Sequence, residues 1–458
     1  MIENDAFKLL LINLFHLNPD DITNIVCTTF NKMMVLLVTL ADKHQACPYC
    51  GFTAPKIKEY VTKEITHSAL TTQKCIIKYR ARRYKCPCCG KTYYEFNPFV
   101  FKSQKISILT VHNILKDLKD FNETFTSVAR RYHVSPTSVS TIFDNHVDIG
   151  RNPLPEIINF DEVYAFKSEK SKYVCVLLDF KKQIPVDVLP NRKKEYLLNY
   201  FQKIPLEERK KVKYACSDMY EVYRDVVHKV FPEAKHLLDY FHLSQDFHKK
   251  MNEVRIKVMK GYKDNKASDE YYLLKKFNWL LFKNPEDEDK HGRLFDVERE
   301  RKYNYHFKSY MNYYDLRKKL LDINNDLTIC YSLKLELVDF YSKSTIDNAK
   351  VNLENLIRSC IDTNIEEMIK FSNNLINWKQ EIINSFTIVD TEYKVEADKG
   401  QVVVCNKKVN NAIIENRNKI IKCIKNNANG YTNWSRFRNR VMYVLDPNTT
   451  FSLEPREK

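Results

Sequence analysis

Hydrophobic positions between Ile157 and Asp239 switch between strand-like and helix-like spacing, and the rest of the chain is organised around this stretch. Short apolar runs predict strands at 157–160, 173–178, 184–189, 212–216 and 234–238. Helical spacing predicts helices at 193–201 and from Val222 to Val230. Three strands followed by alternating helix and strand indicate a mixed sheet with helices packed on its faces.

Acidic residues follow several of these predicted strands. Asp161 and Glu162 follow the first strand, Asp218 follows the fourth, and Asp239 follows the fifth. Carboxylates just past strand ends, where a sheet opens to solvent, are more often site residues than core residues. The pattern therefore predicts an acidic site at one edge of the sheet.

Two Cys-x-x-Cys pairs, each followed by glycine, stand near the N-terminus: Cys47 with Cys50, and Cys86 with Cys89. This spacing suits one structural zinc ion held by four thiolates, with no open position for catalysis. Cys88 lies between two ligand positions and is interpreted as a bystander. The alternatives are a disulfide or buried free thiols. We assign residues 1–105 to a zinc-binding N-terminal domain in which a hairpin over residues 60–83 spans the two pairs.

The second half of that hairpin, from Lys78 to Lys85, alternates basic and aromatic residues. Such a strand can lay cations along a phosphate backbone, so Arg80, Arg82 and Arg83 are candidate DNA contacts. The alternative is a solvated strand face.

Residues 106–150 have the spacing of a three-helix DNA-binding unit. Two amphipathic helices precede a turn at Val134, after which Ser135 caps a third helix that begins at Pro136. This is helix-turn-helix spacing, although three-helix units also occur without DNA. The third helix is expected to present to a DNA groove its outward residues Thr137, Ser138 and Thr141.

The remaining chain is read as a helical insertion and a returning helix. Residues 246–400 are mostly helical in pattern, and we expect an all-helical insertion interrupted by the acidic loop at 285–289. The spacing of apolar residues at 410–425 predicts an amphipathic helix with a stripe of polar residues. This stripe either faces solvent or faces a metal site. That stripe consists of Asn411, Glu415, Asn418 and Lys422. Beyond it, Arg436 and Arg438 are candidate phosphate contacts.

Charge and composition narrow the classes of function. Lys and Arg number 74 against 58 Asp and Glu, a net charge of +16 that favours a polyanion such as DNA. The 7 glycines are scattered, which excludes Gly-rich dinucleotide and phosphate-binding loops. The acidic N-terminal sequence is not typical of a signal peptide, and the longest apolar run, 33–41, is too short to span a membrane. We therefore expect a cytoplasmic protein without membrane partners.

Taken in order, these motifs resemble the bacterial insertion-sequence transposases of the ISL-three (ISL3) type over about 85–90% of the chain. No single motif is decisive, but the ordered set is specific. The chain departs from the family pattern at Ala412 and Asn416, beside the Glu motif, and at Tyr240, where Arg is expected. The resemblance is carried by Cys47-x-x-Cys50, Cys86-x-x-Cys89, Ser135-Pro136, Phe160-Asp161-Glu162, Ser217-Asp218-Met219-x-x-x-Tyr223, Asp239-x-Phe241-His242 and Asn411-x-x-x-Glu415-x-x-Asn418.

The resemblance implies a multidomain α+β protein whose ribonuclease-H-like core, residues 155–245 and 401–445, is interrupted by the insertion. It implies an Asp-Asp-Glu triad at Asp161, Asp218 and Glu415. Three separated carboxylates suit two Mg²⁺ ions, which would serve strand cleavage and joining of 3′-OH ends to target DNA. Asp239 is the main competitor for the third position, and the groups expected to support the triad are Asp239, His242, Asn411 and Asn418.

The partners expected are double-stranded DNA, both element ends and target, and a second copy of the chain in the DNA complex. A metal-dependent nuclease that cuts without joining is the rival enzyme. A second alternative is a non-catalytic DNA-binding regulator, which would keep the zinc and helix-turn-helix regions while its sheet domain has no activity. A tyrosine recombinase, which needs a covalent protein–DNA link, has no support beyond the 28 tyrosines.

Overall fold

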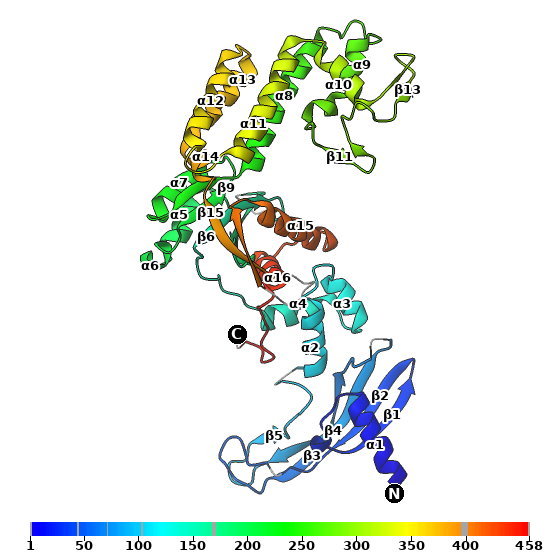
Figure 1. The fold of residues 1–458 in the computed structure, drawn as a ribbon. Coiled ribbons are helices and arrows are strands. Elements are labelled where there is room, and N and C mark those ends of the chain that lie inside the picture. The colour runs from blue at the N-terminus through cyan, green and yellow to red at the C-terminus, as the bar shows by residue number, and fades with distance from the viewer. Residues whose placement is uncertain are drawn as a thin grey trace.

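The chain is elongated, with its folded units following one another along the long axis in the computed structural model (Figure 1). The structure describes residues 2–43, 45–70, 72–101, 104–166, 171–394 and 402–456. Figure 1 shows the N-terminal sheet at one end, a small helical unit beside it, a central sheet, and a helical arm at the other end. The mixed α+β, multidomain architecture expected from the sequence is confirmed at this level.

The N-terminal unit is a curved sheet in the order β1-β2-β4-β3, with β5 paired to β4. Antiparallel pairing of β3 with β4 places Tyr60 opposite Arg82, which is the hairpin expected from the sequence. One face of the sheet is closed by α1, whose Leu11 and Ile12 are buried. The elements are α1 (Ile2–Leu14), η1 (Pro19–Asp21), β1 (Ile22–Phe30), β2 (Met33–Leu40), β3 (Lys56–Thr66), β4 (Cys75–Lys85) and β5 (Thr92–Tyr94).

The predicted three-helix unit is present as α2 (Ile108–Asp117), α3 (Phe125–Arg131) and α4 (Pro136–His146). The side chain of Ser135 accepts a hydrogen bond from the Ser138 amide, and Pro136 occupies the first turn, as the sequence indicated. The turn before α4 uses a left-handed backbone at His133, φ 54°. The apolar side chains of the three helices share one small core.

The central sheet has the order β10-β9-β6-β7-β8. Strands β9 and β10 run parallel to β6, whereas β7 is antiparallel to both β6 and β8. The carboxyl ends of β6, β9 and β10 therefore meet at one edge of the sheet. The strands are β6 (Ile157–Val163), β7 (Val174–Asp179), β8 (Pro185–Leu189), β9 (Tyr214–Ser217) and β10 (Lys235–Leu238).

Both faces of this sheet are covered, which explains why every residue of β7 is buried. Cys175 and Leu177 face the side covered by α5 (Lys194–Gln202) and α7 (Glu221–Val230), with α6 (Leu206–Arg209) between those helices in sequence. Val174 and Val176 face the side covered by α15 (Ala412–Asn427) and α16 (Trp434–Leu445). The result is a three-layer arrangement in which α15 returns to the sheet after a long excursion.

That excursion is a helical arm that grows out of the sheet at Asp239. The sequence led us to expect an all-helical insertion, and this expectation is wrong because the arm also contains strands. Two short hairpins form near the distal end of the arm. Pro285 precedes the first hairpin, whose turn ends at Gly292 with φ 93°, and the turn of the second contains Lys308 with φ 49°. These hairpins are β11 (Glu288–Asp289) with β12 (Gly292–Arg293), and β13 (Lys302–Asn304) with β14 (Ser309–Met311).

The helices of the arm bury one continuous apolar core of their own. A third hairpin, β15 (Ile388–Lys394) with β16 (Val402–Lys408), leads back to α15, and the domain boundary expected near residue 400 lies outside the described residues. Among the described residues, none of the helices has both the length and the apolarity of a membrane span. The helices are α8 (Tyr240–Lys260), α9 (Asp269–Lys276), η2 (Asn278–Phe282), α10 (Tyr313–Leu321), α11 (Asn325–Lys343), α12 (Ala349–Asp362), α13 (Glu366–Asn377) and α14 (Lys379–Asn384).

The C-terminal helix α16 joins the three-helix unit to the central sheet. Phe437 and Val441 pack in the core shared with β7 and β8. Tyr443 is buried among the helices of the three-helix unit, and its hydroxyl donates to the Leu115 carbonyl oxygen at 2.9 Å. The guanidinium of Arg440, 1% exposed, donates to the carbonyl oxygens of Asp120 and Glu123, both at 2.8 Å. The three-helix unit is thus completed by residues more than 300 positions away.

We expect Tyr443→Ala to loosen the three-helix unit without unfolding the central sheet. Removing a buried aromatic ring costs about 3–5 kcal/mol, and here most of that loss falls on the contact with α2 and α4. Hydrogen–deuterium exchange should become faster in α2 and α4 and stay unchanged in β7. Tyr443→Phe, which loses only one hydrogen bond worth about 1 kcal/mol, is the control. Unchanged exchange of α2 in Tyr443→Ala would contradict this role of α16.

Candidate metal centres

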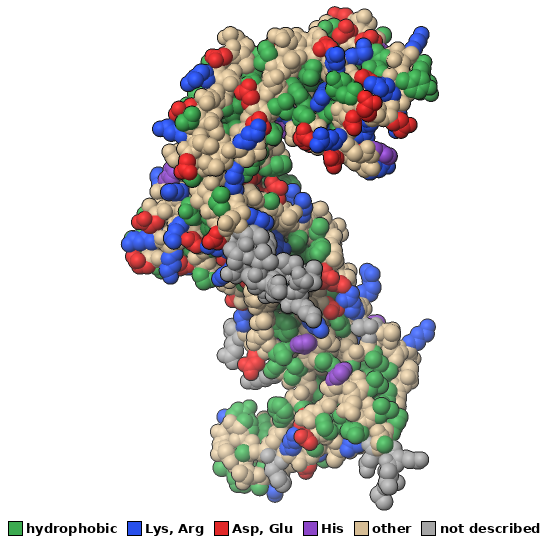
Figure 2. Space-filling view, viewed as in Figure 1, with side chains coloured by type: hydrophobic (Ala, Val, Ile, Leu, Met, Phe, Trp, Pro, Cys, Tyr) green, Lys and Arg blue, Asp and Glu red, His purple; other side chains and the backbone are tan. Residues whose placement is uncertain are grey.

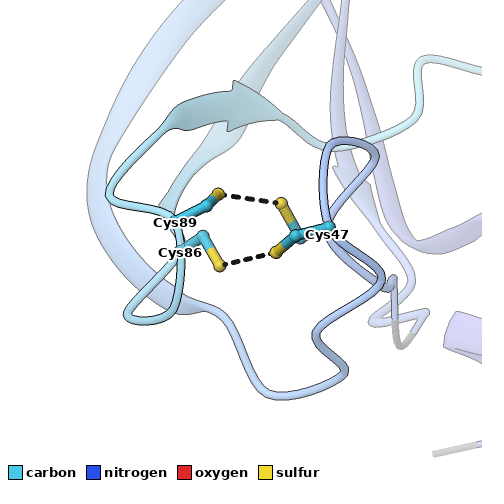
Figure 3. Close-up of side chains that lie close together, drawn as sticks. Cys47, Cys86 and Cys89 are labelled. Carbon is cyan, nitrogen blue, oxygen red and sulfur yellow. Dashed lines mark hydrogen bonds between the residues drawn. The ribbon is translucent and has the colours of Figure 1, made fainter.

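Four cysteine sulfurs converge between the two N-terminal knuckles (Figure 3). The Sγ atoms of Cys47 and Cys89 lie 3.7 Å apart, and those of Cys50 and Cys86 lie 3.5 Å apart. Tetrahedral zinc with bonds of about 2.3 Å requires sulfurs about 3.8 Å apart. The geometry is therefore compatible with a zinc knuckle built from the four predicted residues.

The two knuckles share the same local hydrogen bonds. The amide of Gly51 donates to the Cys47 carbonyl oxygen, and the amide of Gly90 donates to that of Cys86, both at 2.9 Å. Both glycines adopt left-handed backbone, φ 75° and 72°, which lets each turn close behind its cysteine pair. The strand β4 ends at Lys85 and delivers the second knuckle directly opposite the first.

The local backbone favours ionisation of one thiol in this cluster, whereas burial and contacts among the sulfurs raise the pKa values of Cys50 and Cys89. The amide of Cys89 lowers the pKa of the Cys86 thiol to about 7. Thiolates rather than thiols bind zinc, so this donor prepares one of the four ligands. Cys88 is exposed and outside the cluster, in agreement with its interpretation as a bystander.

The second centre lies at the carboxyl edge of the central sheet. Asp161 occupies a position within β6, which extends two residues beyond it, rather than following the strand as the sequence suggested. Asp218 follows β9 directly, and Asp239 follows β10 and precedes α8. Because these three strands are parallel neighbours, their acidic side chains meet at one edge, as predicted.

Helix α15 is held against this edge by its amide side chains. Asn418 Nδ2 donates to Asp161 Oδ2 at 2.7 Å. Asn411 Oδ1 accepts from Asn159 Nδ2 at 2.7 Å, while Asn411 Nδ2 donates to the Phe160 carbonyl oxygen at 3.2 Å. Asn411 and Asn418 are both buried, so this part of the polar stripe is docked rather than solvated. Lys422, at the far end of the stripe, is exposed.

Glu415 lies between these two asparagines and reaches the acidic edge. Ligand atoms of Asp239, His242 and Glu415 all lie within 4.8 Å of one another. Asp239 is also in contact with α15, because its Oδ1 accepts from the Asn411 amide at 3.4 Å. We expected Asp239 either to be more distant than the triad or to support it. Among the described residues, the group within 4.8 Å that includes Glu415 contains Asp239 and His242 but not Asp161 or Asp218.

Burial and mutual repulsion perturb these carboxyl groups. Burial and, after it, the nearby charge of Asp218 raise the pKa of Asp161 to about 7. Burial also raises the pKa values of Asp218 and Asp239, opposed in both cases by His242. Several carboxylates with raised pKa values at one edge are typical of a site that a cation completes.

The donor atoms at this edge fit a hard divalent cation. Within the described part of the chain, Asp218 Oδ1, Asp239 Oδ2 and His242 Nε2 are buried without a hydrogen-bond partner. Buried polar atoms of this kind are usually satisfied, and carboxylate oxygens are the ligands that Mg²⁺ prefers. A pocket of about 350 Å³ opens beside Asp218 and His242 and extends to Lys249.

Sequence reasoning missed an arginine that lies next to this centre. Arg192 forms an ion pair with Glu162, and its guanidinium lies 4.6 Å and 4.8 Å from the ring centres of Tyr173 and Tyr220. The charge of Arg192 also partly offsets the burial that raises the pKa of the neighbouring Asp218. The only sequence signal was an isolated Asn-Arg pair after the third strand, which carries no periodicity.

The predicted DNA-contact residues fall into two groups. Arg80, Thr137 and Thr141 are exposed, and Ser138 is half-buried at the start of α4. The other four arginines are held in intramolecular ion pairs, so a DNA contact would have to compete with an existing partner. These pairs are Arg82 with Glu95, Arg83 with Glu59, Arg436 with Asp144 and Arg438 with Asp187.

The departure from the family pattern at Tyr240 has a structural counterpart. The ring of Tyr240 stacks on Tyr341 of α11 with ring centres 3.7 Å apart. It therefore packs against the root of the arm, where an arginine would have placed a charge.

We expect purified protein to contain about one equivalent of zinc and Cys86→Ser to lose it. Serine cannot supply the thiolate ligand, and the small core around Cys47, Tyr84 and Tyr93 depends on the knuckles. Cys88→Ser is the matched control and should retain the metal. Elemental analysis decides the matter: less than half an equivalent in the unmutated protein rules out this site.

The carboxylate edge should make the stability of magnesium-free protein depend on pH. Because the pKa of Asp161 is raised to about 7, the folded state binds its proton more tightly than the unfolded chain does. This contribution to stability is present at low pH and is lost as pH rises through about 7. Asp218→Asn removes a repelling charge, so it should raise the melting temperature at pH 8 and have little effect at pH 5. Thermal unfolding without added Mg²⁺ measures this; a lower melting temperature of the variant at pH 8 would contradict it.

Comparisons with known proteins identify the family of the chain. A family model for ISL3-type DDE elements, with the description Transposase, matches residues 158–397, just over half of the chain. The chain is also similar to the transposase for insertion sequence element IS1001 of Bordetella parapertussis, with 19% identity over 408 residues that cover 89% of this chain and 90% of that protein. The matched segment contains Asp161, Asp218 and Asp239 and ends before Glu415. The chain belongs to the ISL3 family of insertion-sequence transposases.

Proposed function

We propose that this transposase binds the ends of an insertion sequence, cleaves DNA strands there, and joins the freed 3′-OH ends to target DNA. Asp161, Asp218 and Glu415 are assigned as the catalytic carboxylates that hold two Mg²⁺ ions. Asp239 and His242 support this site. The four-cysteine cluster is assigned to one structural zinc ion.

The observation that carries this proposal is the meeting of four carboxyl groups from segments far apart in the sequence. Glu415 is 197 residues beyond Asp218 (415 − 218), yet the negative charges of Glu415 and Asp218 both act on the pKa of Asp161. Such a cluster opposes folding, because it buries like charges together. A pair of divalent cations that serve phosphoryl transfer would offset this repulsion.

The order of the central sheet supports a ribonuclease-H-like core. Numbered in chain order, the strands stand as 3-2-1-4-5, with only the second antiparallel to the rest. Asp161 lies on the first of these strands and Asp218 just after the fourth, and α15 brings Glu415 back to the sheet after the arm. This arrangement agrees with an Asp-Asp-Glu core that is interrupted before the Glu, which the family resemblance implies.

The chemistry assigned to the chain's own residues is positioning. Asp161, Asp218 and Glu415 would hold the ions; Asn418 fixes the carboxylate of Asp161, and Asn411 fixes the start of α15 against β6. When bound, a pair of Mg²⁺ ions activates the attacking oxygen and stabilises the leaving oxygen of an in-line displacement. No side chain is needed as nucleophile, because water attacks during cleavage and the 3′-OH attacks during joining.

DNA recognition is assigned to the N-terminal half. Thr137 and Thr141 are exposed on α4 and suit contacts in a DNA groove, and Arg80 is exposed on β4 and suits a phosphate. The contact between Tyr443 of α16 and Leu115 of α2 fixes the three-helix unit relative to the carboxylate edge. A bound end would therefore be presented to the catalytic site in a defined orientation, with a second copy of the chain expected on the other end.

Substitution of the carboxylates tests the proposal. Asp161→Asn, Asp218→Asn and Glu415→Gln should each lower Mg²⁺-dependent cleavage and joining at least about 100-fold, because each removes a charge that holds the ions. Binding of the element ends should change less than about twofold. The measurement uses duplexes that carry the flanking ends of the element, with strand cleavage and joined products separated on gels.

Two further variants assign the third carboxylate. Glu233→Gln, an exposed acid just before β10, is the control and should keep full activity. Asp239→Asn should retain more activity than Glu415→Gln. If Glu415→Gln cleaves normally while Asp239→Asn does not, Asp239 is the third member instead. Cleavage without any joined product would favour the plain nuclease.

A further inference from the structure

The distal end of the arm carries a group of exposed tyrosines that the proposed catalytic site does not use. On the hairpin formed by β13 and β14, Tyr303 is 44% exposed, Tyr305 86% and Tyr310 66%. Tyr303 lies at the centre of the group, with ring centres 5.2 Å from Tyr305 and 5.3 Å from Tyr310. Aromatic rings held this far out of the core are unfavourable unless a partner covers them.

A pocket of about 530 Å³ lies directly beside these rings. This volume falls within the roughly 300–1,000 Å³ of small-ligand sites. Tyr272 and Tyr313 contribute to its wall, and Tyr272 is held in place by stacking on His306 with ring centres 4.0 Å apart. The wall is therefore partly aromatic and partly polar, and Tyr303 and Tyr305 beside it are open to solvent.

Basic residues outnumber acidic ones in the wall of this pocket, although the neighbouring segment 285–298 is acidic. The segment from Arg299 to Met311 contains four basic residues and one acidic residue. Arg299 is engaged by Asp289, and its guanidinium lies 5.5 Å from the ring centre of Tyr313. In the described part of the chain, Lys290 and Lys302 at the pocket have no ion-pair partner. These two ammonium groups are available to an anionic ligand.

The distal end of the arm lies on the same side of the molecule as α15 (Figure 1). The β11 hairpin forms the part that hangs toward α15, and the β13 hairpin with the tyrosines lies at the outer end of the arm. Figure 2 shows basic and acidic side chains side by side on this end. The tyrosines are therefore presented at the outer end of the arm, away from the central sheet.

We propose that this aromatic tip binds an unpaired stretch of DNA, with bases stacked on Tyr305 and Tyr303 and phosphates beside Lys302 and Lys290. The inference rests on the proposed function, since strand cleavage frees the unpaired strand. Stacking on tyrosine and backbone neutralisation by lysine are the two contacts by which proteins hold single strands without reading their sequence. A duplex is a poorer occupant, because its bases are already stacked within the helix.

The test uses the full-length protein without Mg²⁺ and a fluorescent 20-nucleotide oligothymidylate. An excess of unlabelled duplex occupies the duplex-binding surfaces. Tyr305→Ala should weaken binding about 5- to 100-fold, because one stacked base is lost. Tyr305→Phe keeps the ring and should bind as the unmutated protein does, and Lys302→Ala should reduce the dependence of binding on salt. Affinity for the duplex should be the same in all variants.

Photo-crosslinking locates the bound strand directly. An oligonucleotide with 5-iodouracil in place of one thymine should crosslink to the peptide that contains Tyr303 and Tyr305. Unchanged binding by Tyr305→Ala, or equal losses in Tyr305→Ala and Tyr305→Phe, would overturn the proposal. Displacement by polyglutamate as effective as by oligothymidylate would assign the tip to an acidic polypeptide and would overturn it also.

The outcome is separable from that of the proposed catalytic function. Cleavage of element ends is scored in a different assay, in which Glu415→Gln fails and Tyr305→Ala retains strand cleavage. Protein that binds the single strand through Tyr305 but never cleaves would contradict the catalytic assignment alone. Protein that cleaves normally but binds no single strand at the tip would contradict the tip assignment alone.

Discussion

Repulsion among buried carboxylates is the constraint on which the central part of this molecule depends. Asp161, Asp218 and Asp239 all have raised pKa values because they are buried, and Glu415 joins them from a distant helix. Close packing of like charges opposes folding, so the surrounding elements must hold the edge together. They do so through two covered sheet faces and a set of buried amide hydrogen bonds from α15.

The amide contacts explain how a long excursion of the chain is compatible with a rigid site. The arm leaves the sheet at Asp239 and the chain returns at Asn411, and the backbone amide of Asn411 donates to the Asp239 carboxylate. Exit and re-entry points are thus tied together. The apolar core of the arm includes Leu238 of β10 but is otherwise distinct from the two cores on the faces of the sheet. The distal part of the arm can therefore carry a different surface without altering the carboxylate edge.

The same principle applies toward the N-terminus. Helix α16 packs on the sheet through Phe437 and on the three-helix unit through Tyr443, so the unit assigned to DNA binding is fastened to the unit assigned to catalysis. Arg440 adds charge-assisted hydrogen bonds to two carbonyl oxygens in the connection between α2 and α3. The ion pairs of Arg436 and Arg438 also stabilise this junction. These arginines are therefore less available for the phosphate contacts that the sequence suggested.

The sequence by itself determined the elements whose signals are local. Period-two and period-3.6 patterns predicted the strands of the central sheet, Ser135 and Pro136 marked the start of α4, and the Cys-x-x-Cys-Gly spacing indicated the knuckles. Each signal lies within a few residues, where backbone geometry and side-chain chemistry act directly. Only the tertiary structure decided which distant groups meet. It placed Asp239 beside Glu415, docked Tyr443 in the three-helix unit and paired Arg192 with Glu162, because such contacts depend on how covered faces pack and not on spacing along the chain.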